Sequence, residues 1–216
     1  MVKMKKAVIF GASGFVGSYL LEQLLINDEY VQVTAIVRRS LPVYHPKLKI
    51  LIGDFYTSLS LKDQIEADEV FITLGGTTPK IDHDYPILAA QIAKEKGAKS
   101  VFVVTAVGAS IHSRISYVKI KGEIERDLIA LDFEHTHIFR PSMIMGNRKE
   151  FHLVEKIMIA LWRVLNLFFI GGMSRYKGME AKNIARAMIN AAKNPFVKVR
   201  VYHWKDMNDL LLNYKV

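Results

Sequence analysis

The sequence predicts an α/β fold in which helices cover both faces of a parallel sheet. Short apolar runs alternate with longer segments of helical periodicity along most of the 216 residues, and this alternation is typical of crossover connections between parallel strands. Two runs, Val8–Phe10 and Val101–Val104, are apolar throughout, as expected of strands buried on both faces. Right-handed crossovers then give a doubly wound sheet, with ligands at the carboxyl ends of its strands.

The first part of the chain is expected to hold six strands and three helices. Strands are short apolar runs that end at turn residues, and the helix over 15–27 has apolar residues at positions 15, 16, 20, 21, 24 and 25, which is helical spacing. The expected strands are Lys6–Phe10, Val31–Val37, Leu48–Ile52, Val70–Leu74, Val101–Thr105 and His135–Phe139. The expected helices are Phe15–Asn27, Pro86–Lys96 and Tyr117–Leu131.

After Pro141 the alternation becomes less regular. Helices are expected at 151–169, 182–193 and 206–213, with a strand at 198–202. This region is too short to fold alone, so we expect one domain over residues 1–216, with residues 143–180 contributing most of a small substrate lobe. The apolar positions of the helix at 151–169 favour core packing over a membrane anchor or a cover for a substrate.

Composition excludes several classes of function. The chain has no cysteine, which excludes disulfides, thiolate metal sites and a cysteine nucleophile; a reducing compartment fits, and we expect a cytoplasmic protein. The net charge of +9 is scattered, so a nucleic-acid partner is not expected. Gly11 interrupts the first apolar run, and the longest one, Phe151–Ile170, contains three charges. Neither a signal peptide nor a transmembrane segment is therefore expected.

Histidine spacing does not predict a metal site. His135 and His137 lie two apart on an expected strand, hence on one face. A solvated or edge-strand face explains that spacing better than metal ligation does, and we expect no bound metal.

A glycine-rich loop follows the first expected strand and opens the first helix. Its sequence is Gly11-Ala-Ser13-Gly14-Phe15-Val16-Gly17, and with 13 glycines in the chain three glycines at this spacing are expected by chance about 0.04 times per chain. Gly11 allows a tight turn, Gly14 lets backbone N–H groups approach a pyrophosphate, and Gly17 allows close helix packing. The helix N-terminus and the Ser13 hydroxyl add favourable interactions with phosphate.

The end of the second expected strand indicates which nicotinamide cofactor is bound. NAD-binding proteins usually place an acidic residue there for the ribose 2′-hydroxyl, but here the chain reads Arg38-Arg39-Ser40. Guanidinium groups suit a 2′-phosphate. The sequence therefore favours NADP(H) over NAD(H), although one of the two arginines could simply be a solvated charge.

Two further strand ends fit a bound dinucleotide. Asp54, after Gly53, is placed to accept a hydrogen bond from an adenine amino group, and Phe55 follows it. Leu74-Gly75-Gly76 puts small residues where cofactor and backbone would pass. Both features are also compatible with ordinary turns.

Tyr117 and Lys121 lie four apart on an expected helix and so share one face. In carbonyl reduction a tyrosine gives a proton to the carbonyl oxygen, and an adjacent ammonium favours the phenolate and lowers the tyrosine pKa from about 10. The lysine can also hold the nicotinamide ribose. The spacing alone is weak evidence for a catalytic pair. Without the preceding glycine loop we would interpret it as a solvent-facing pair on a helix.

These motifs together resemble the short-chain dehydrogenase/reductase superfamily in its extended and atypical branches, and within it the Tat-interacting-protein-like, NADPH-binding group. The resemblance covers about 6–192 and rests on G-A-S-G-F-V-G, V-R-R-S, G-D-F, L-G-G-T, V-V-T-A-V-G-A, Y-V-K-I-K-G-E-I-E and F-R-P-S-M-I-M-G. It implies a Rossmann-type fold, catalytic roles for Tyr117 and Lys121, and a cofactor carboxamide contact near Pro141-Ser142-Met143.

One position departs from the superfamily pattern. These enzymes usually carry a serine at the end of the fifth strand, where this chain has Ala106. Thr105 or Ser110 is the expected substitute. The sequence therefore predicts an NADP(H)-dependent oxidoreductase for a small carbonyl or alcohol. A cofactor-binding sensor or scaffold without turnover and a nucleotide-sugar epimerase or dehydratase remain alternatives, and a homodimer is suggested by fold analogy alone.

Overall fold

The computed structural model describes residues 4–53, 60–76, 78, 80–146, 169, 171–193 and 195–213. The strands within them are β1 (Lys5–Phe10), β2 (Tyr30–Val37), β3 (Leu48–Ile52), β4 (Glu69–Ile72), β5 (Ser100–Val104), β6 (His135–Phe139), β7 (Ile144–Met145), β8 (Met179–Glu180) and β9 (Val199–Tyr202). The α-helices are α1 (Phe15–Ile26), α2 (Tyr85–Glu95), α3 (Ser116–Ala130), α5 (Ala181–Lys193) and α6 (Trp204–Asn213). Shorter helical turns are Lys62–Gln64, the π-helical Lys80–Asp84 and Gly171–Tyr176.

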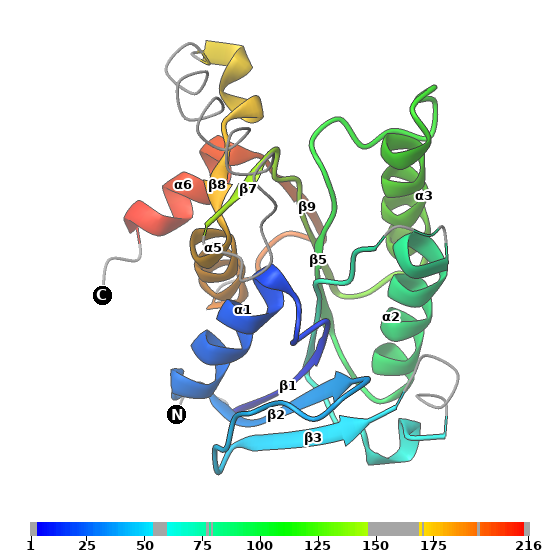
Figure 1. The fold of residues 1–216 in the computed structure, drawn as a ribbon, viewed down its shortest axis with the longest axis vertical. Helices are drawn as coiled ribbons and strands as arrows, with labels where there is room; N and C mark the ends of the chain where they lie inside the picture. The colour runs from blue at the N-terminus through cyan, green and yellow to red at the C-terminus, as the bar shows by residue number, and fades with distance from the viewer. Residues whose placement is uncertain are drawn as a thin grey trace.

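The predicted doubly wound parallel sheet is confirmed. Seven strands form one sheet in the order β3-β2-β1-β4-β5-β6-β9, and every neighbouring pair is parallel. The chain adds β2 and β3 on one side of β1 and the remaining strands on the other (Figure 1). The switch point therefore lies between β1 and β4, where the glycine loop begins.

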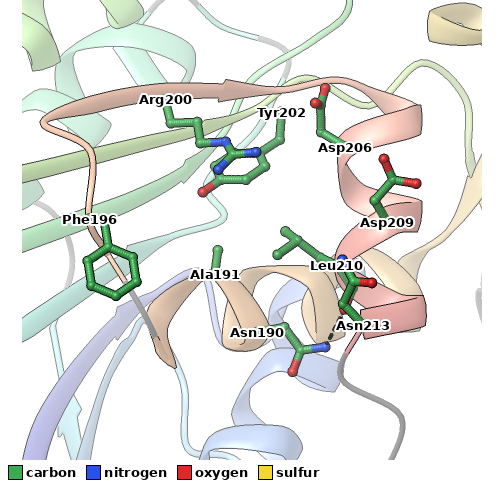
Figure 2. A pocket seen from close by; sticks show the side chains of 9 residues that line it. All are labelled: Asn190, Ala191, Phe196, Arg200, Tyr202, Asp206, Asp209, Leu210 and Asn213. Carbon is green, nitrogen blue, oxygen red and sulfur yellow. Dashed lines mark hydrogen bonds between the residues drawn. The ribbon is translucent and has the colours of Figure 1, made fainter.

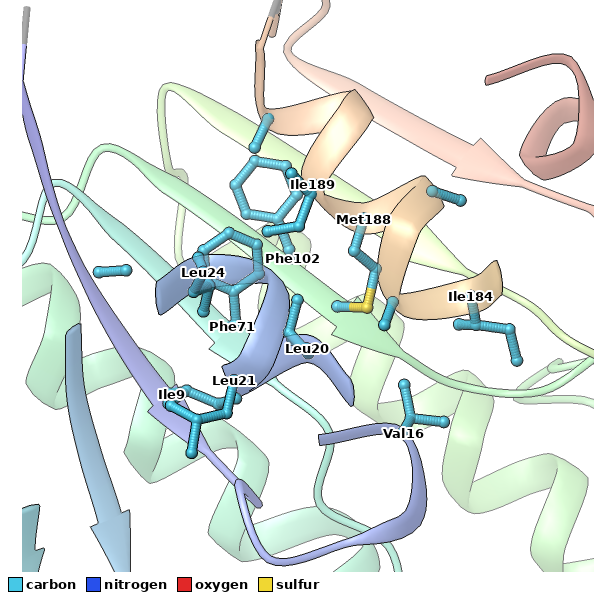
Figure 3. Close-up of a cluster of buried hydrophobic side chains, with 14 of the residues drawn as sticks. Ile9, Val16, Leu20, Leu21, Leu24, Phe71, Phe102, Ile184, Met188 and Ile189 are labelled. Atoms are coloured by element: carbon cyan, nitrogen blue, oxygen red, sulfur yellow. The ribbon is translucent and has the colours of Figure 1, made fainter. Parts of the chain in front are cut away.

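Helices form a layer on each face of this sheet. In Figure 1, α1 and α5 lie on one side and α2 and α3 on the other. Successive residues of β1 alternate between the layers, since Ile9 packs with the α1 and α5 side chains and Val8 with those of α2 and α3. Figure 3 shows the first core, in which side chains of α1 and α5 meet over Phe71 and Phe102 of neighbouring strands.

The C-terminal part of the chain completes the sheet and one of its helix layers. Helix α5 packs beside α1, and β9 pairs with β6 as the last strand. A short β7–β8 pair joins Ile144 to Met179, and strands of two residues carry no periodic signal. The expected helix at 151–169 falls almost wholly outside the described residues. Among the helices that are described, none is long and apolar enough to cross a bilayer.

His137 is buried in the core, so the expected solvated or edge position is wrong for this residue. Its ring stacks on Phe102 at 4.7 Å and on Tyr202 at 5.7 Å, and it is 1% exposed. The reason is topological: β9 pairs alongside β6 and makes it an interior strand.

Candidate cofactor and catalytic site

The glycine loop packs directly against the end of β4. Gly11 has a φ of +93°, and a Cβ there would lie 2.7 Å from Thr73 Oγ1. A Cβ on Gly17 would lie 1.9 Å from the Gly11 carbonyl oxygen. Thr73 donates a hydrogen bond to that same oxygen at 3.2 Å. The loop thus needs glycine both for its turn and for the close approach of α1.

The N-terminus of α1 lies at the carboxyl ends of the strands, because it follows the glycine loop directly after β1. Gly14 is the N-cap, with no side-chain cap bond and no acidic residue in the first turn. Ser13 is exposed and Phe15 half-buried, whereas the Val16 side chain lies in the core. Unsatisfied N–H groups at a helix start favour an anion, so this loop fits the pyrophosphate of a dinucleotide.

The arginines expected to recognise phosphate follow β2, next to the glycine loop. Arg38, Arg39 and Ser40 are all exposed, and within the described residues neither arginine forms an ion pair. β2 is paired with β1 up to Ile36, which brings the end of β2 beside the loop. Asp54 and Phe55 lie outside the described residues.

The Leu74-Gly75-Gly76 turn crosses the edge of the sheet where β4 ends. Leu74 packs against the core on the α2 and α3 side. A Cβ on Gly75 would meet nothing within 4 Å, whereas one on Gly76 would lie 2.6 Å from Ile81. The backbone at Gly75 therefore borders open space beside the switch point.

Tyr117 and Lys121 share one face of α3, and the lysine is held by an unexpected partner. Lys121 Nζ lies 5.5 Å from the centroid of the Tyr117 ring and 2.8 Å from Asp82 Oδ1. Lys121 is 3% exposed and Asp82 5%, while Tyr117 is 50% exposed. The buried ammonium is thus neutralised by a carboxylate, and the tyrosine is reachable from solvent.

The expected lowering of the Tyr117 pKa is wrong in this arrangement. Partial burial, and then the negative charge of Asp82, raise the pKa of Tyr117 above 10.0. Lys121 has its charge compensated by Asp82 at 2.8 Å, which explains why the lysine does not stabilise the phenolate.

The hydroxyl of Thr105 is engaged inside the protein. It donates a hydrogen bond of 2.6 Å to Glu125 Oε1, and the same carboxylate accepts two hydrogen bonds from the Arg140 guanidinium. Thr105 and Glu125 are both buried. This places Thr105 in a structural network below the site, and Ala106 beside it is buried as well.

Ser110 lies in the loop that packs against α3. A Cβ on Gly122 would lie 2.4 Å from the Ser110 carbonyl carbon, so this glycine lets the loop approach the helix. Ser110 Oγ accepts a hydrogen bond from the His112 N–H at 3.3 Å. The hydroxyl hydrogen is therefore still available as a donor.

Pro141, Ser142 and Met143 follow β6 and run beside the end of β5. The Pro141 carbonyl accepts a hydrogen bond from the Val107 N–H at 2.8 Å, and the Met143 carbonyl accepts one from Met179 at 2.9 Å. Ser142 and Met143 are half-buried. The segment is thus fixed at the edge where the resemblance implies a carboxamide contact.

Four residues near the site were not identified from the sequence: Thr73, Asp82, Gly122 and Glu125. Their partners lie far away along the chain, as with Lys121, which is 39 positions from Asp82. Of the four, only Asp82 has a local sequence signal: it is an acidic residue a few positions after the Gly75-Gly76 turn. Such a residue indicates that a positively charged side chain lies nearby.

A separate pocket of about 490 Å³ lies between β9, α5 and α6. Figure 2 shows the Arg200 guanidinium beside the Tyr202 ring, with Asp206 and Asp209 on α6 at the rim of the pocket. None of its lining residues belongs to the glycine loop or to α3. This pocket is therefore distinct from the candidate cofactor site.

Comparison with known proteins identifies the family. A model of NAD(P)H-binding proteins matches residues 11–157. The chain belongs to the NAD(P)H-binding family. "Protein FMP52, mitochondrial" of Eremothecium gossypii is 35% identical over 155 residues, covering 68% of this chain and 69% of the relative. The protein of the same name from Aspergillus fumigatus is 30% identical over 204 residues, 87% of each chain.

Solved structures place this NAD(P)H-binding protein in the same fold class. "MoeE5 in complex with UDP-glucose and NAD" has a TM-score of 0.66 at 18% identity, and the match covers 96% of this chain and 81% of that one. At this identity the likeness shows the fold alone. The part of the resemblance that concerns an NAD(P)H-binding, Rossmann-type protein is confirmed. The expected cytoplasmic location is contradicted, because the curated relatives are named mitochondrial.

Proposed function

We propose that the protein is an NADP(H)-dependent oxidoreductase that acts on a small carbonyl or alcohol. The observation that carries this proposal is the placement of the Tyr117–Lys121 pair. Lys121 is bonded to Asp82, and Asp82 accepts a hydrogen bond from the Gly76 N–H at 3.3 Å. The pair is thereby connected to the turn that borders the glycine loop.

Each residue of the site has a chemical role in this proposal. The loop from Gly11 to Gly17 holds the pyrophosphate, and Ser13 adds a hydrogen-bond donor. A bound nicotinamide supplies or accepts the hydride. Tyr117 gives a proton to the carbonyl oxygen, or takes one from the alcohol. Lys121, with its ammonium beside the Tyr117 ring, acts as the electrostatic partner of the tyrosine. Proton transfer of this kind contributes typically ~10²–10⁴-fold to the rate.

The preference for NADP(H) is supported by Arg38 and Arg39, both exposed at the end of β2. We expect NADPH to bind at least about tenfold more tightly than NADH, which corresponds to ~1.4 kcal/mol. Side-by-side fluorescence titrations at fixed ionic strength measure the difference. The Arg38→Asp variant should reverse it. Undiminished NADPH binding by that variant would show that Arg38 does not recognise the 2′-phosphate.

Turnover is tested with a panel of small carbonyl compounds and NADPH. Tyr117→Phe should lose turnover by at least ~10²-fold while NADPH binding stays intact. Ser110→Ala is the companion variant, because Ser110 is the remaining candidate for the missing serine. Full activity of Tyr117→Phe would remove the tyrosine from the mechanism.

A second function is favoured by the state of Thr105 and Ala106. The Thr105 hydroxyl is bonded to Glu125, and alanine has no hydroxyl to orient a carbonyl. These observations support a protein that binds NADPH without turnover and acts as a sensor or scaffold. NADPH binding without turnover by wild-type protein across the whole panel would support this second function over the first.

A further inference from the structure

Asp82 connects three parts of the candidate site. It lies in the π-helical turn Lys80–Asp84 that precedes α2. Its Oδ1 atom accepts a hydrogen bond from Lys121 Nζ at 2.8 Å and from the Gly76 N–H at 3.3 Å. The Asp82 side chain is 8% exposed and that of Lys121 4%. Removing either partner of such a pair would leave the other as an uncompensated buried charge, which is strongly destabilising.

We propose that Asp82 is a positioning residue of this site: it fixes the Lys121 ammonium beside the Tyr117 ring and offsets its charge there. The part that Asp82 takes in a reaction rests on the proposed function. The effect of Asp82 on Lys121 and Tyr117 is independent of the proposed function and is tested separately.

The charges around Tyr117 support this role. An isolated ammonium 5.5 Å from the ring would favour the phenolate. The Asp82 carboxylate bonded to that ammonium removes most of its effect, and the pair is shielded from water by burial. The pKa of Tyr117 accordingly lies above its usual value, through burial and then through Asp82. A neutral tyrosine at physiological pH suits reduction of a carbonyl better than oxidation of an alcohol.

A neighbouring histidine fixes the segment that carries Asp82. His83 Nε2 lies 2.9 Å from Asp127 Oδ2 on α3, and His83 Nδ1 lies 2.9 Å from Asp84 Oδ1. The π-helical turn is thus attached to α3 at two places, once through His83 and once through the Asp82–Lys121 pair. The position of Asp82 relative to Tyr117 is therefore set by the fold itself.

Titration of Tyr117 tests the proposal without any turnover. The ultraviolet absorbance of tyrosinate is followed against pH in the wild type and in Asp82→Asn. Tyr117→Phe is made in each background, because the chain has nine tyrosines and the difference isolates Tyr117. We expect Asp82→Asn to lower the Tyr117 pKa, because the carboxylate that raises it is removed and the Lys121 ammonium is left without its partner. Glu95→Gln, which removes an exposed acid at the last residue of α2, is the control and should leave the Tyr117 pKa unchanged.

An unchanged Tyr117 titration in folded Asp82→Asn would overturn the proposal. Lys121→Met provides a second measurement should Asp82→Asn fail to fold, with circular dichroism as the check. It leaves the negative charge and removes the positive one, so the Tyr117 pKa should rise; a fall or no change would also overturn the proposal.

Separate NADPH titrations distinguish this proposal from the proposed function. A Tyr117 shift in a protein that does not bind NADPH refutes the proposed function but leaves the Asp82 contact standing. NADPH binding together with an unchanged Tyr117 refutes the role of Asp82 alone. If turnover is found, the alkaline limb of kcat/KM for reduction should move to lower pH in Asp82→Asn.

Discussion

Acidification should destabilise this protein through His137. The imidazole is 1% exposed, its Nδ1 atom lies 2.8 Å from the Tyr202 hydroxyl, and its Nε2 atom is buried without a partner among the described residues. Burial, with smaller contributions from His135 and Arg200, lowers the pKa of His137 to about 4. The native state therefore holds this side chain neutral down to that pH.

The size of the effect follows from linkage. The unfolded chain protonates His137 near pH 6.5, whereas the native state resists until about pH 4. Stability is thus complete above the unfolded pKa and falls as pH drops below it, because the unfolded state binds more protons. Between about pH 7 and about pH 5 the loss from this residue is roughly 2 kcal/mol. That is a substantial part of a typical total stability of ~5–15 kcal/mol.

Urea unfolding at several pH values between these limits measures the loss. His137→Phe keeps an aromatic ring in the stack with Phe102 but removes the titrating group. Between about pH 7 and about pH 5 its unfolding free energy should therefore decrease by about 2 kcal/mol less than that of the wild type. Tyr202→Phe retains the imidazole and should retain the loss. His203, whose pKa is also lowered by burial, is present in all three proteins and cancels. Equal pH dependence in the wild type and His137→Phe would refute the reasoning.

Two further predictions concern stability. Gly17→Ala places a Cβ 1.9 Å from the Gly11 carbonyl oxygen, so the unfolding free energy should fall by about 1–3 kcal/mol and NADPH binding should weaken in the same protein. Glu69→Leu removes the buried carboxylate that bonds Lys5 and Tyr30, and thermal unfolding should show a loss of about 3 kcal/mol. Glu66→Gln, on an exposed pair, is the control and should leave the midpoint unchanged. An unaltered midpoint in either test variant would contradict its prediction.

Much of the fold is predictable because its signals are local. The expected strands Leu48–Ile52 and His135–Phe139 coincide with β3 and β6, since Gly53 and Arg140-Pro141 mark where these runs end. The expected strand Val70–Leu74 extends two residues past β4, which ends at Ile72. Its neighbour β1 ends in register at Phe10, and Thr73 turns its hydroxyl back to the glycine loop. A sequence run does not show where its ladder partner stops.

The residues of the candidate site were likewise predictable only where their signals are local. Glycine spacing and the four-residue spacing of Tyr117 and Lys121 are local, and both were recognised. The partners of Thr105 and Lys121 were not, since Glu125 and Asp82 come from other elements. The expected direction of the Tyr117 pKa shift was wrong for this reason. Tyr117 and Lys121 alone predict a lowered pKa, whereas Tyr117 and Lys121 with Asp82 give a raised one.

The arrangement of α3 shows why those partners matter beyond single contacts. Tyr117, Lys121 and Glu125 are spaced by four and lie along one face of the helix. Lys121 is neutralised by Asp82 from the turn before α2, and Glu125 by Arg140 from the end of β6. Unpaired, either charge would be too costly to bury. Ion pairs from both flanking elements thus allow a polar stripe to face the sheet. They also fix the helix along its axis, which apolar packing alone does less specifically. The half-exposed Tyr117 lies at the N-terminal end of this polar stripe. The two ion pairs on the same helix face therefore help to fix its position.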